Sequence, residues 1–184
     1  MDTLILILIG MILVICFIIG IYLILYNKIQ DYIIRINEVE SIIDNNLRQK
    51  YDNINKISSI IKGNEKIKVD KKIIDEIVKL KNKKISNFNF DRKLVEISNY
   101  FTSLKEKNKE IKNNEEIINI TNKISELDEL LLINKEYYNR NIAEYNKLIK
   151  LFPTNIVASI CKYKEKLFFD RKDMSDEDYN DFKL

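Results

Sequence analysis

The sequence predicts an all-α protein: an N-terminal single transmembrane helix followed by an antiparallel helical bundle of about four helices, two of them long. Three observations lead to this prediction. An uncharged apolar stretch lies near the N-terminus, two long segments repeat apolar residues at helical spacing, and only 3 Gly and 1 Pro occur among 184 residues. Because sheets with tight turns need Gly and Pro at those turns, their scarcity favours long helices.

The first element is the apolar stretch from Leu4 to Tyr26, which contains no charged residue. A helix of that length extends about 34 Å, enough to cross a hydrocarbon core of about 30 Å, so residues 1–26 are expected to be a transmembrane anchor. A cleaved signal peptide would instead have a basic segment, a shorter apolar core and small residues at its cleavage site. A lipoprotein cysteine at Cys16 would need a small residue before it, where Ile15 stands.

The charges next to this stretch predict its orientation. No Lys or Arg precedes it, whereas Lys28 and Arg35 follow it. The positive-inside rule therefore places the C-terminal domain in the cytoplasm, at the cell membrane, with a single pass. The only 2 cysteines are Cys16 and Cys161, one in the apolar stretch and one in the remainder, so no intramolecular disulfide is expected.

Residues 27–62 predict a first long helix, because apolar residues recur there at alternating spacings of four and three. Gly63 follows at the position where a C′ glycine ends a helix. Nothing between Tyr26 and Asn27 breaks the backbone, so the anchor is expected to continue into this helix as one rigid rod. The inward positions are 29, 33, 36, 40, 43, 47, 50, 54, 57 and 61, all apolar except Glu40 and Lys50.

Two shorter helices are expected in the middle of the chain. After a linker over residues 64–69, Asp70 is the predicted N-cap of a helix that extends to about Lys84. After a further loop, Asp91 is the predicted N-cap of the next helix, and residues 105–112 are expected to turn. The predicted inward faces consist of Ile73, Ile77 and Leu80 in the first helix and Leu94, Ile97, Phe101 and Leu104 in the second.

A second long helix is predicted from about Asn114 to Leu151, again from a spacing of four and three. Pro153 should end it, and Thr154 is the predicted N-cap of a short final helix to about Phe169. Several apolar stripes in one chain need mutual burial, which favours a bundle, although a heptad stripe also fits an intermolecular coiled coil. The inward positions are 117, 120, 124, 127, 131, 134, 138, 141, 145, 148 and 152.

The charge distribution argues against nucleic-acid binding. The net charge is only +3, and both signs are mixed along the chain. Residues 62–84 are rich in lysine and would face anionic lipid headgroups if they folded back to the bilayer; otherwise they form a solvated face. Residues 170–184 form an acidic tail that is expected to be flexible.

Catalytic and cofactor sites are not expected from these residues. The chain has no His, which removes the usual general base and the usual zinc ligand. The glycines that cradle phosphates are missing, and Cys161 lies in an apolar stretch that is typical of a small core residue. We therefore expect no catalytic residues, no cofactor and no metal.

Two Tyr-Asn pairs, Tyr138-Asn139 and Tyr145-Asn146, lie one heptad apart on the second long helix. We interpret the tyrosines as core residues whose hydroxyl groups reach a partner at the edge of the bundle. Asn134 and Asn141 on the same face could set the register of packing, as a buried Asn does in coiled coils. The alternative is a groove between helices that binds a peptide or a small ligand.

These pairs and several other short motifs resemble those of the LemA family, in the same order along nearly the whole chain. The resemblance implies a bacterial single-pass membrane protein with a LemA-like helical bundle over residues 27–169, no established activity and no catalytic residues to carry over. The motifs are Tyr26-Asn27, Tyr51-Asp52, Lys62-Gly63, Tyr138-Asn139, Tyr145-Asn146, Phe152-Pro153-Thr154-Asn155, Ala158 and Phe169-Asp170.

The chain departs from the family pattern at three positions. Glu40 stands near a usual tryptophan, Asn55 replaces a usual proline, and Lys162 replaces a glycine near the final helix. These differences concern local kinks and core packing rather than the architecture.

The function that we expect is that of an interaction or scaffold module anchored in the membrane. Its partners would be the lipid bilayer and a protein, either a different protein or a second copy of the chain. The alternatives are a self-assembling structural protein that organises or stiffens membrane, and a small-molecule sensor that binds between helices near Tyr138 and Tyr145. The candidate interaction residues are Tyr26, Asn27, Tyr138, Asn139, Tyr145, Asn146, Pro153 and Asn155.

Overall fold

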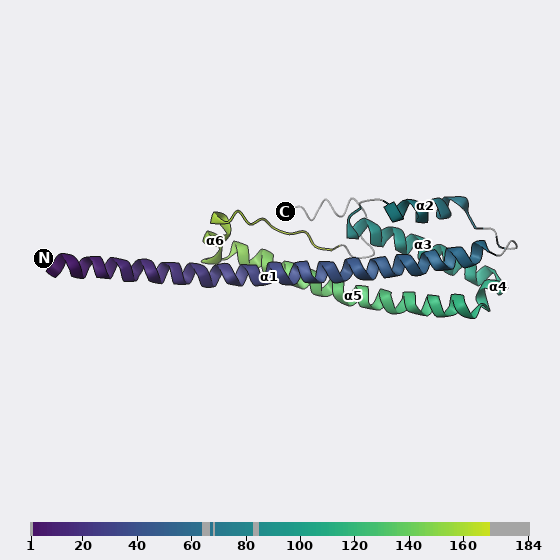
Figure 1. Cartoon of the computed structure of the whole chain (residues 1–184), viewed down its shortest axis with the longest axis horizontal. Coiled ribbons are helices and arrows are strands. Elements are labelled where there is room, and N and C mark those ends of the chain that lie inside the picture. The colour runs from purple at the N-terminus through teal and green to yellow at the C-terminus, as the bar shows by residue number, and fades with distance from the viewer. Residues whose placement is uncertain (1, 64–66, 68, 83–84, 170–184) are drawn as a thin grey trace. The chain divides into compact units, whose positions relative to one another are not determined.

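The computed structural model describes residues 2–63, 67, 69–82 and 85–169, and every regular element in these ranges is a helix (Figure 1). The predicted all-α class is therefore confirmed, with α1 and α5 as the two long helices. The helices are α1 (Asp2–Lys62), α2 (Lys71–Asn82), α3 (Asn87–Lys107), α4 (Lys109–Lys112), α5 (Glu115–Lys150) and α6 (Thr154–Ile160). The acidic tail and part of the lysine-rich segment lie outside the described residues.

The chain divides into two compact units, and both long helices contribute to each of them. The first unit consists of residues 1–39 and 137–168, and the second of residues 40–136 and 169–184. The first unit therefore contains the apolar half of α1, the end of α5 and α6. The second contains the remainder of α1, the start of α5 and helices α2 to α4.

The apolar part of α1 is exposed on all sides. Large apolar side chains from Leu4 to Ile24 are between 40% and 70% exposed, and the most apolar window has a mean hydropathy of 3.4 with none of it buried. Within the described residues, α1 is the one helix that is long and apolar enough to cross a membrane. A signal sequence near an N-terminus can also be long and apolar enough to meet this criterion.

The helix α1 passes from Tyr26 to Asn27 without a break, as predicted, and ends at Lys62. The predicted C′ role of Gly63 is only half right. The Gly63 N–H donates to the Ser59 carbonyl at 3.2 Å, but the Gly63 backbone does not adopt the left-handed conformation. This last bond continues the helical ladder, so the position does not require glycine.

The seam predicted for α1 is buried. Its isoleucines and leucines from Ile29 to Ile61 are at most 3% exposed apart from the half-buried Ile33, and Glu40 is exposed. Lys50, the other non-apolar seam residue, is only 1% exposed. The helical spacing therefore predicts the burial of Lys50 although its residue type argues against it, whereas the inward position predicted for Glu40 is wrong, because the neighbouring Val39 is buried instead.

Helices α1 and α5 are antiparallel in each unit. In the first unit, Ile29 and Ile36 cluster with Ile149 and Ile142. In the second unit, Lys50 pairs with Asp128. Residue numbers thus rise along α1 as they fall along α5. The buried apolar residues of α5 are Ile117, Ile120, Ile124, Leu127, Leu131, Ile142, Tyr145 and Ile149.

Asp70 caps α2 as predicted, because the Lys72 N–H donates to the Asp70 carboxylate at 2.9 Å. The cap predicted for the next helix is wrong. Helix α3 begins at Asn87, and its N-cap is Ser86, whose hydroxyl oxygen accepts from the Asn89 N–H at 3.3 Å. Asp91 therefore lies inside α3, where its carboxylate is free to pair with another element.

The turn predicted over residues 105–112 is replaced by helix. Helix α3 continues to Lys107, and Asn108 then caps the short α4 by accepting from the Glu110 N–H at 2.9 Å. An Asn side chain that satisfies the first free N–H groups allows the chain to restart a helix at once. Leu94, Ile97 and Phe101 are buried as predicted.

The final helix is shorter than predicted, and Thr154 does not cap it. The Thr154 hydroxyl donates to the carbonyls of Leu148 and Leu151, the latter at 2.8 Å, and so closes the end of α5 instead. Helix α6 ends at Ile160, and the predicted continuation to Phe169 is wrong because residues 161–169 have no helical structure.

The end of α6 explains this early stop. The Tyr163 N–H donates to the Ala158 carbonyl at 2.9 Å and the Lys162 N–H to the Ser159 carbonyl at 3.2 Å, which together form a Schellman motif. Lys162 at the C′ position has a φ of 55°, in the left-handed region that favours glycine. A lysine thus occupies a backbone conformation that suits the glycine expected near this position.

We predict that Lys162→Gly stabilises the protein by about 1 kcal/mol, because glycine lacks the Cβ that opposes a left-handed backbone. The midpoint of thermal unfolding, followed by circular dichroism in detergent micelles, should rise. Lys164→Gly is the matched control, since Lys164 does not have a positive φ. An equal rise in both variants, or no rise in Lys162→Gly, would contradict the prediction.

Candidate interaction residues and polar clusters

Tyr145 and Asn146 hold the segment that follows α6. We call residues 161–168 the strap. The buried Tyr145 donates its hydroxyl to the Lys164 carbonyl at 3.0 Å, and burial raises its pKa above the ordinary value. Asn146 donates to the Lys166 carbonyl at 2.8 Å and accepts from the Lys166 N–H at 2.9 Å. The predicted role of Tyr145, a hydroxyl that reaches a partner at the edge of the bundle, is confirmed.

A second set of contacts joins the strap to α1 within the first unit. Gln30 donates to the Tyr163 hydroxyl at 2.5 Å, and the Tyr22 hydroxyl lies 3.5 Å from the Cys161 sulfur. Burial, followed by a hydrogen bond with Tyr26, raises the pKa of Tyr163 to about 12. The strap is therefore held on one side by α5 and on the other by α1.

The remaining candidate residues do not converge on one site. Tyr26 and Tyr138 pack against the first unit's core and Asn139 is half-buried, whereas Asn27, Pro153 and Asn155 are exposed. Asn134 and Asn141 donate to carbonyls four residues earlier in α5, Leu130 and Tyr137, each at 2.8 Å. The register role expected of these two asparagines stays a prediction.

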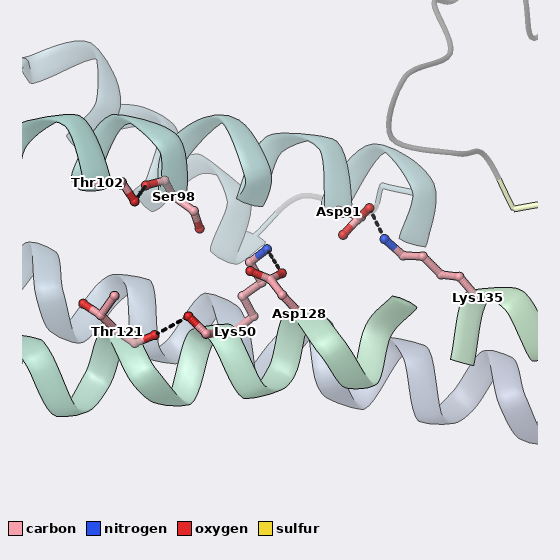
Figure 2. A network of polar contacts seen from close by, with 8 residues as sticks. Lys50, Asp91, Ser98, Thr102, Thr121, Asp128 and Lys135 are labelled. Carbon is pink, nitrogen blue, oxygen red and sulfur yellow. Dashed lines mark hydrogen bonds and ion pairs between the residues drawn. The ribbon is translucent and has the colours of Figure 1, made fainter. Parts of the chain in front are cut away.

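The second unit contains an ion pair that the sequence reasoning did not identify. The Lys50 ammonium donates to the Asp128 carboxylate at 2.5 Å and joins α1 to α5 (Figure 2). The Lys50 side chain is 1% exposed and that of Asp128 is 50% exposed. The lysine therefore crosses the interior with its apolar stem and places its charge beside a carboxylate at the edge of the core.

A second ion pair, between Asp91 of α3 and Lys135 of α5, lies in the same unit (Figure 2). Both side chains are mostly buried. The Lys135 ammonium also lies 5.2 Å from the centre of the Phe169 ring, which packs edge-on against Phe88 at 6.3 Å. Phe169, which belongs to the Phe169-Asp170 motif, is thus a buried contact of the second unit.

One signal in the sequence could have revealed the Lys50 pair. Lys50 occupies an inward position of the seam, and a buried ammonium requires a carboxylate partner. The spacing alone does not name that partner, because the relative register of α1 and α5 is needed for that. The Asp91 pair was hidden for a different reason, since Asp91 was assigned to a helix cap.

Two hollows lie in the second unit. One, of about 380 Å³, lies between α2 and α3 and is lined by side chains of both charges. At this hollow the Lys93 ammonium pairs with Glu96 at 2.8 Å and with Glu76 at 3.0 Å. These two contacts raise the pKa of Lys93. The other, of about 90 Å³, is lined mainly by apolar residues of α1, α3, α4 and α5. The buried hydroxyl of Ser98 borders it and has no hydrogen-bond partner among the residues that the structure describes. A ligand site near Tyr145 would need open space beside its ring, but the Tyr145 side chain is buried in the core of the first unit.

Among the residues that the structure describes, no group of three or more His, Cys, Asp or Glu side chains is placed to hold a metal ion.

Comparison with known families settles which family this chain represents. A family model described as the LemA family matches residues 39–180. The chain belongs to the LemA family. The resemblance carried by the motifs is thus confirmed, and the match covers the LemA bundle from the middle of α1 onwards. Comparisons with curated proteins and with solved structures found no match.

The LemA motifs in this chain serve mainly internal contacts. Tyr145 and Asn146 hold the strap, Phe169 packs beside Lys135, and Tyr51 donates its hydroxyl to the Ile77 carbonyl of α2 at 3.0 Å. Of the three departures from the family pattern, Lys162 has the clearest structural consequence, since its backbone is left-handed.

We predict that Asp128→Asn destabilises the protein by about 2 kcal/mol, because the buried Lys50 ammonium loses its carboxylate. Lys50→Met removes the charge and keeps the apolar stem, so the double variant should recover most of the loss. Chemical denaturation, followed by circular dichroism, measures the free energy of unfolding of the single and the double variant.

The matched control is Asp44→Asn, which removes an exposed pair with Arg48 one turn away at 2.8 Å. That variant should lose no more than about 0.5 kcal/mol. Equal losses for Asp44→Asn and Asp128→Asn would contradict a special role for the buried lysine.

We predict that Asn146→Ala releases the strap, because two hydrogen bonds to Lys166 disappear. Exchange of the Lys166 amide with solvent deuterium should accelerate roughly tenfold, which corresponds to about 1.4 kcal/mol. Asn155→Ala, at an exposed position of α6, should leave that rate unchanged. Equal rates in Asn146→Ala and the wild type would show that other contacts hold the strap.

Proposed function

We propose that this LemA chain is a membrane-anchored, non-catalytic interaction module whose domain lies at the cytoplasmic face of the cell membrane. The observation that carries the proposal is that one helix, α1, supplies both an exposed apolar stretch and a buried seam. A stretch whose side chains lack protein neighbours needs another apolar environment, and its length suits a bilayer.

The orientation follows from flanking charge. Lys28 and Arg35 follow the stretch, and Arg35 pairs with Asp31 at 2.8 Å one turn earlier. The positive-inside rule counts Lys and Arg rather than net charge, so the pair with Asp31 does not cancel the signal. These charges support a cytoplasmic location for residues 27–184.

The interaction role is supported by exposed apolar residues on α5 in the second unit. Leu130, Leu132 and Ile133 are between 48% and 61% exposed although the opposite face of the helix is buried. We call these three residues the α5 patch. Side chains of this kind are typical of a surface that another protein covers.

A partner pull-down from solubilised membranes tests this role. The wild-type chain should retain a stoichiometric partner, and Leu132→Asp with Ile133→Asp should lose it, because two carboxylates oppose burial of the surface. Glu129→Lys is the control, since Glu129 is exposed beside the α5 patch and already charged. Recovery of the bare monomer from wild-type membranes would contradict the proposal.

The same experiment separates the main alternative. If the partner retained by the wild type is a second copy of the chain, the protein is a self-assembling structural component rather than an adaptor. The patch variants should then shift the purified protein from an oligomer to a monomer in light-scattering measurements.

A further inference from the structure

The corner from α5 into α6 is uncharged and exposes large apolar side chains. Residues 151–161 contain no charged residue, in a chain that is 32% charged. We call these residues the α6 corner. Its exposed large apolar side chains are Leu151 at 51%, Phe152 at 80%, Ile156 at 52% and Ile160 at 63%.

One face of α6 is covered, and apolar side chains are also exposed away from it. Val157 and Ala158 are buried in the core of the first unit. Ile156 and Ile160 lie four residues apart in α6 and therefore point to one common side, away from that core, while Asn155 and Ser159 are exposed beside them. The exposed apolar face of the corner thus consists of Ile156 and Ile160 on α6, with Phe152 in the turn before it.

The α6 corner lies next to the end of the apolar stretch of α1. The Cys161 sulfur is 3.5 Å from the Tyr22 hydroxyl, and Leu25 and Tyr26 pack against the cluster that contains Val157 (Figure 1). At about 1.5 Å per residue, Tyr22 lies about 6 Å before Tyr26 along the helix. The end of α6 is therefore level with the last turn of the stretch that we assign to the bilayer.

The charges on both sides of the α6 corner suit anionic headgroups. Lys147 and Lys150 precede it, and the strap after it carries three lysines and one Glu. Glu165 is paired with Lys150 at 3.0 Å. Lysines near an anionic membrane surface strengthen the attraction between the protein and that surface. An apolar segment between lysines is the pattern of an element that lies in the membrane interface.

We propose that the α6 corner is a second membrane contact, which inserts Phe152, Ile156 and Ile160 into the leaflet from which α1 emerges. The proposal rests on the proposed anchoring of α1. Lipid is the occupant favoured by the structure, because α6 ends beside the last turn of the apolar stretch of α1 and the corner is flanked by lysines. Contact at two points fixes the orientation of the first unit relative to the bilayer, whereas anchoring by α1 alone leaves that orientation unrestrained.

A single-tryptophan experiment tests this contact, because the chain contains no Trp. The full-length Phe152→Trp variant is reconstituted in phosphatidylcholine–phosphatidylglycerol vesicles, with nitroxide groups placed at shallow or deep acyl positions. The Trp emission should shift to shorter wavelength and be quenched more strongly by the shallow nitroxide. Ile156→Trp gives a second reporter on the same face, and circular dichroism checks that both variants fold.

Two control reporters make the outcomes distinguishable. Phe17→Trp, in the apolar stretch of α1, should be quenched by the deep nitroxide, and Ile34→Trp, exposed about 12 Å beyond Tyr26, should not be quenched. No quenching at Phe17→Trp would overturn the anchor itself. Quenching at Phe17→Trp without quenching at Phe152→Trp and Ile156→Trp would overturn the second contact alone. A blue-shifted but unquenched Phe152→Trp would do the same, because it would place the corner against protein.

Discussion

The fold depends on the burial of one apolar face of α1 against α5, and most other features follow from it. Each fully buried isoleucine or leucine contributes about 2 kcal/mol, whereas an exposed ion pair contributes at most about 1 kcal/mol. Burial of the isoleucines and leucines from Ile29 to Ile61 therefore contributes far more to the stability of the fold than surface pairs such as Arg48–Asp44. The chain has little intrinsic helix preference in its many Ile and Asn residues, so packing rather than propensity must hold these helices.

The same helix connects the proposed membrane role to the bundle. Its first part has exposed apolar side chains around the helix, whereas its second part has a buried apolar seam on one side. The change occurs near Tyr26, where Tyr22 and Tyr26 stack at 6.3 Å between ring centres. Tyrosines with an apolar body and a polar tip suit the boundary between hydrocarbon and water. The α6 corner and the strap contact α1 near this boundary. The contacts between these segments of the first unit therefore lie where α1 is proposed to pass from hydrocarbon to water.

Much of the fold could be predicted because helical spacing records burial directly. Apart from the half-buried Ile33 and the exposed Glu40, the inward positions of α1, including Lys50, were correct since a period of 3.6 residues leaves little choice of face. The first and last residues of the helices were harder to predict. Ser86 and Asp91 are both acceptable N-caps, and the sequence does not show which one the chain uses. The end of α6 at Ile160 was missed because lysine is an unusual residue for the left-handed C′ position.

The candidate interaction residues could be predicted only as a set of conspicuous positions. For Tyr145 the expected hydroxyl partner exists, but the partner is the strap, which was predicted to be helix. Asn146 pairs with the backbone of Lys166, and no local pattern indicates a contact between residues so far apart in the sequence. The pairs Lys50–Asp128 and Asp91–Lys135 likewise depend on how helices meet, which spacing within one helix does not determine.

The reactivity of Cys16 tests most directly the claim that the first part of α1 lies in a bilayer. Cys16 is exposed on the apolar stretch, and Cys161→Ser leaves it as the single thiol. In intact membrane vesicles, a charged maleimide that cannot enter the hydrocarbon should leave Cys16 unlabelled until the protein is denatured in detergent. Prompt labelling in intact vesicles, or a mature protein whose mass shows that Cys16 has been removed, would contradict the account.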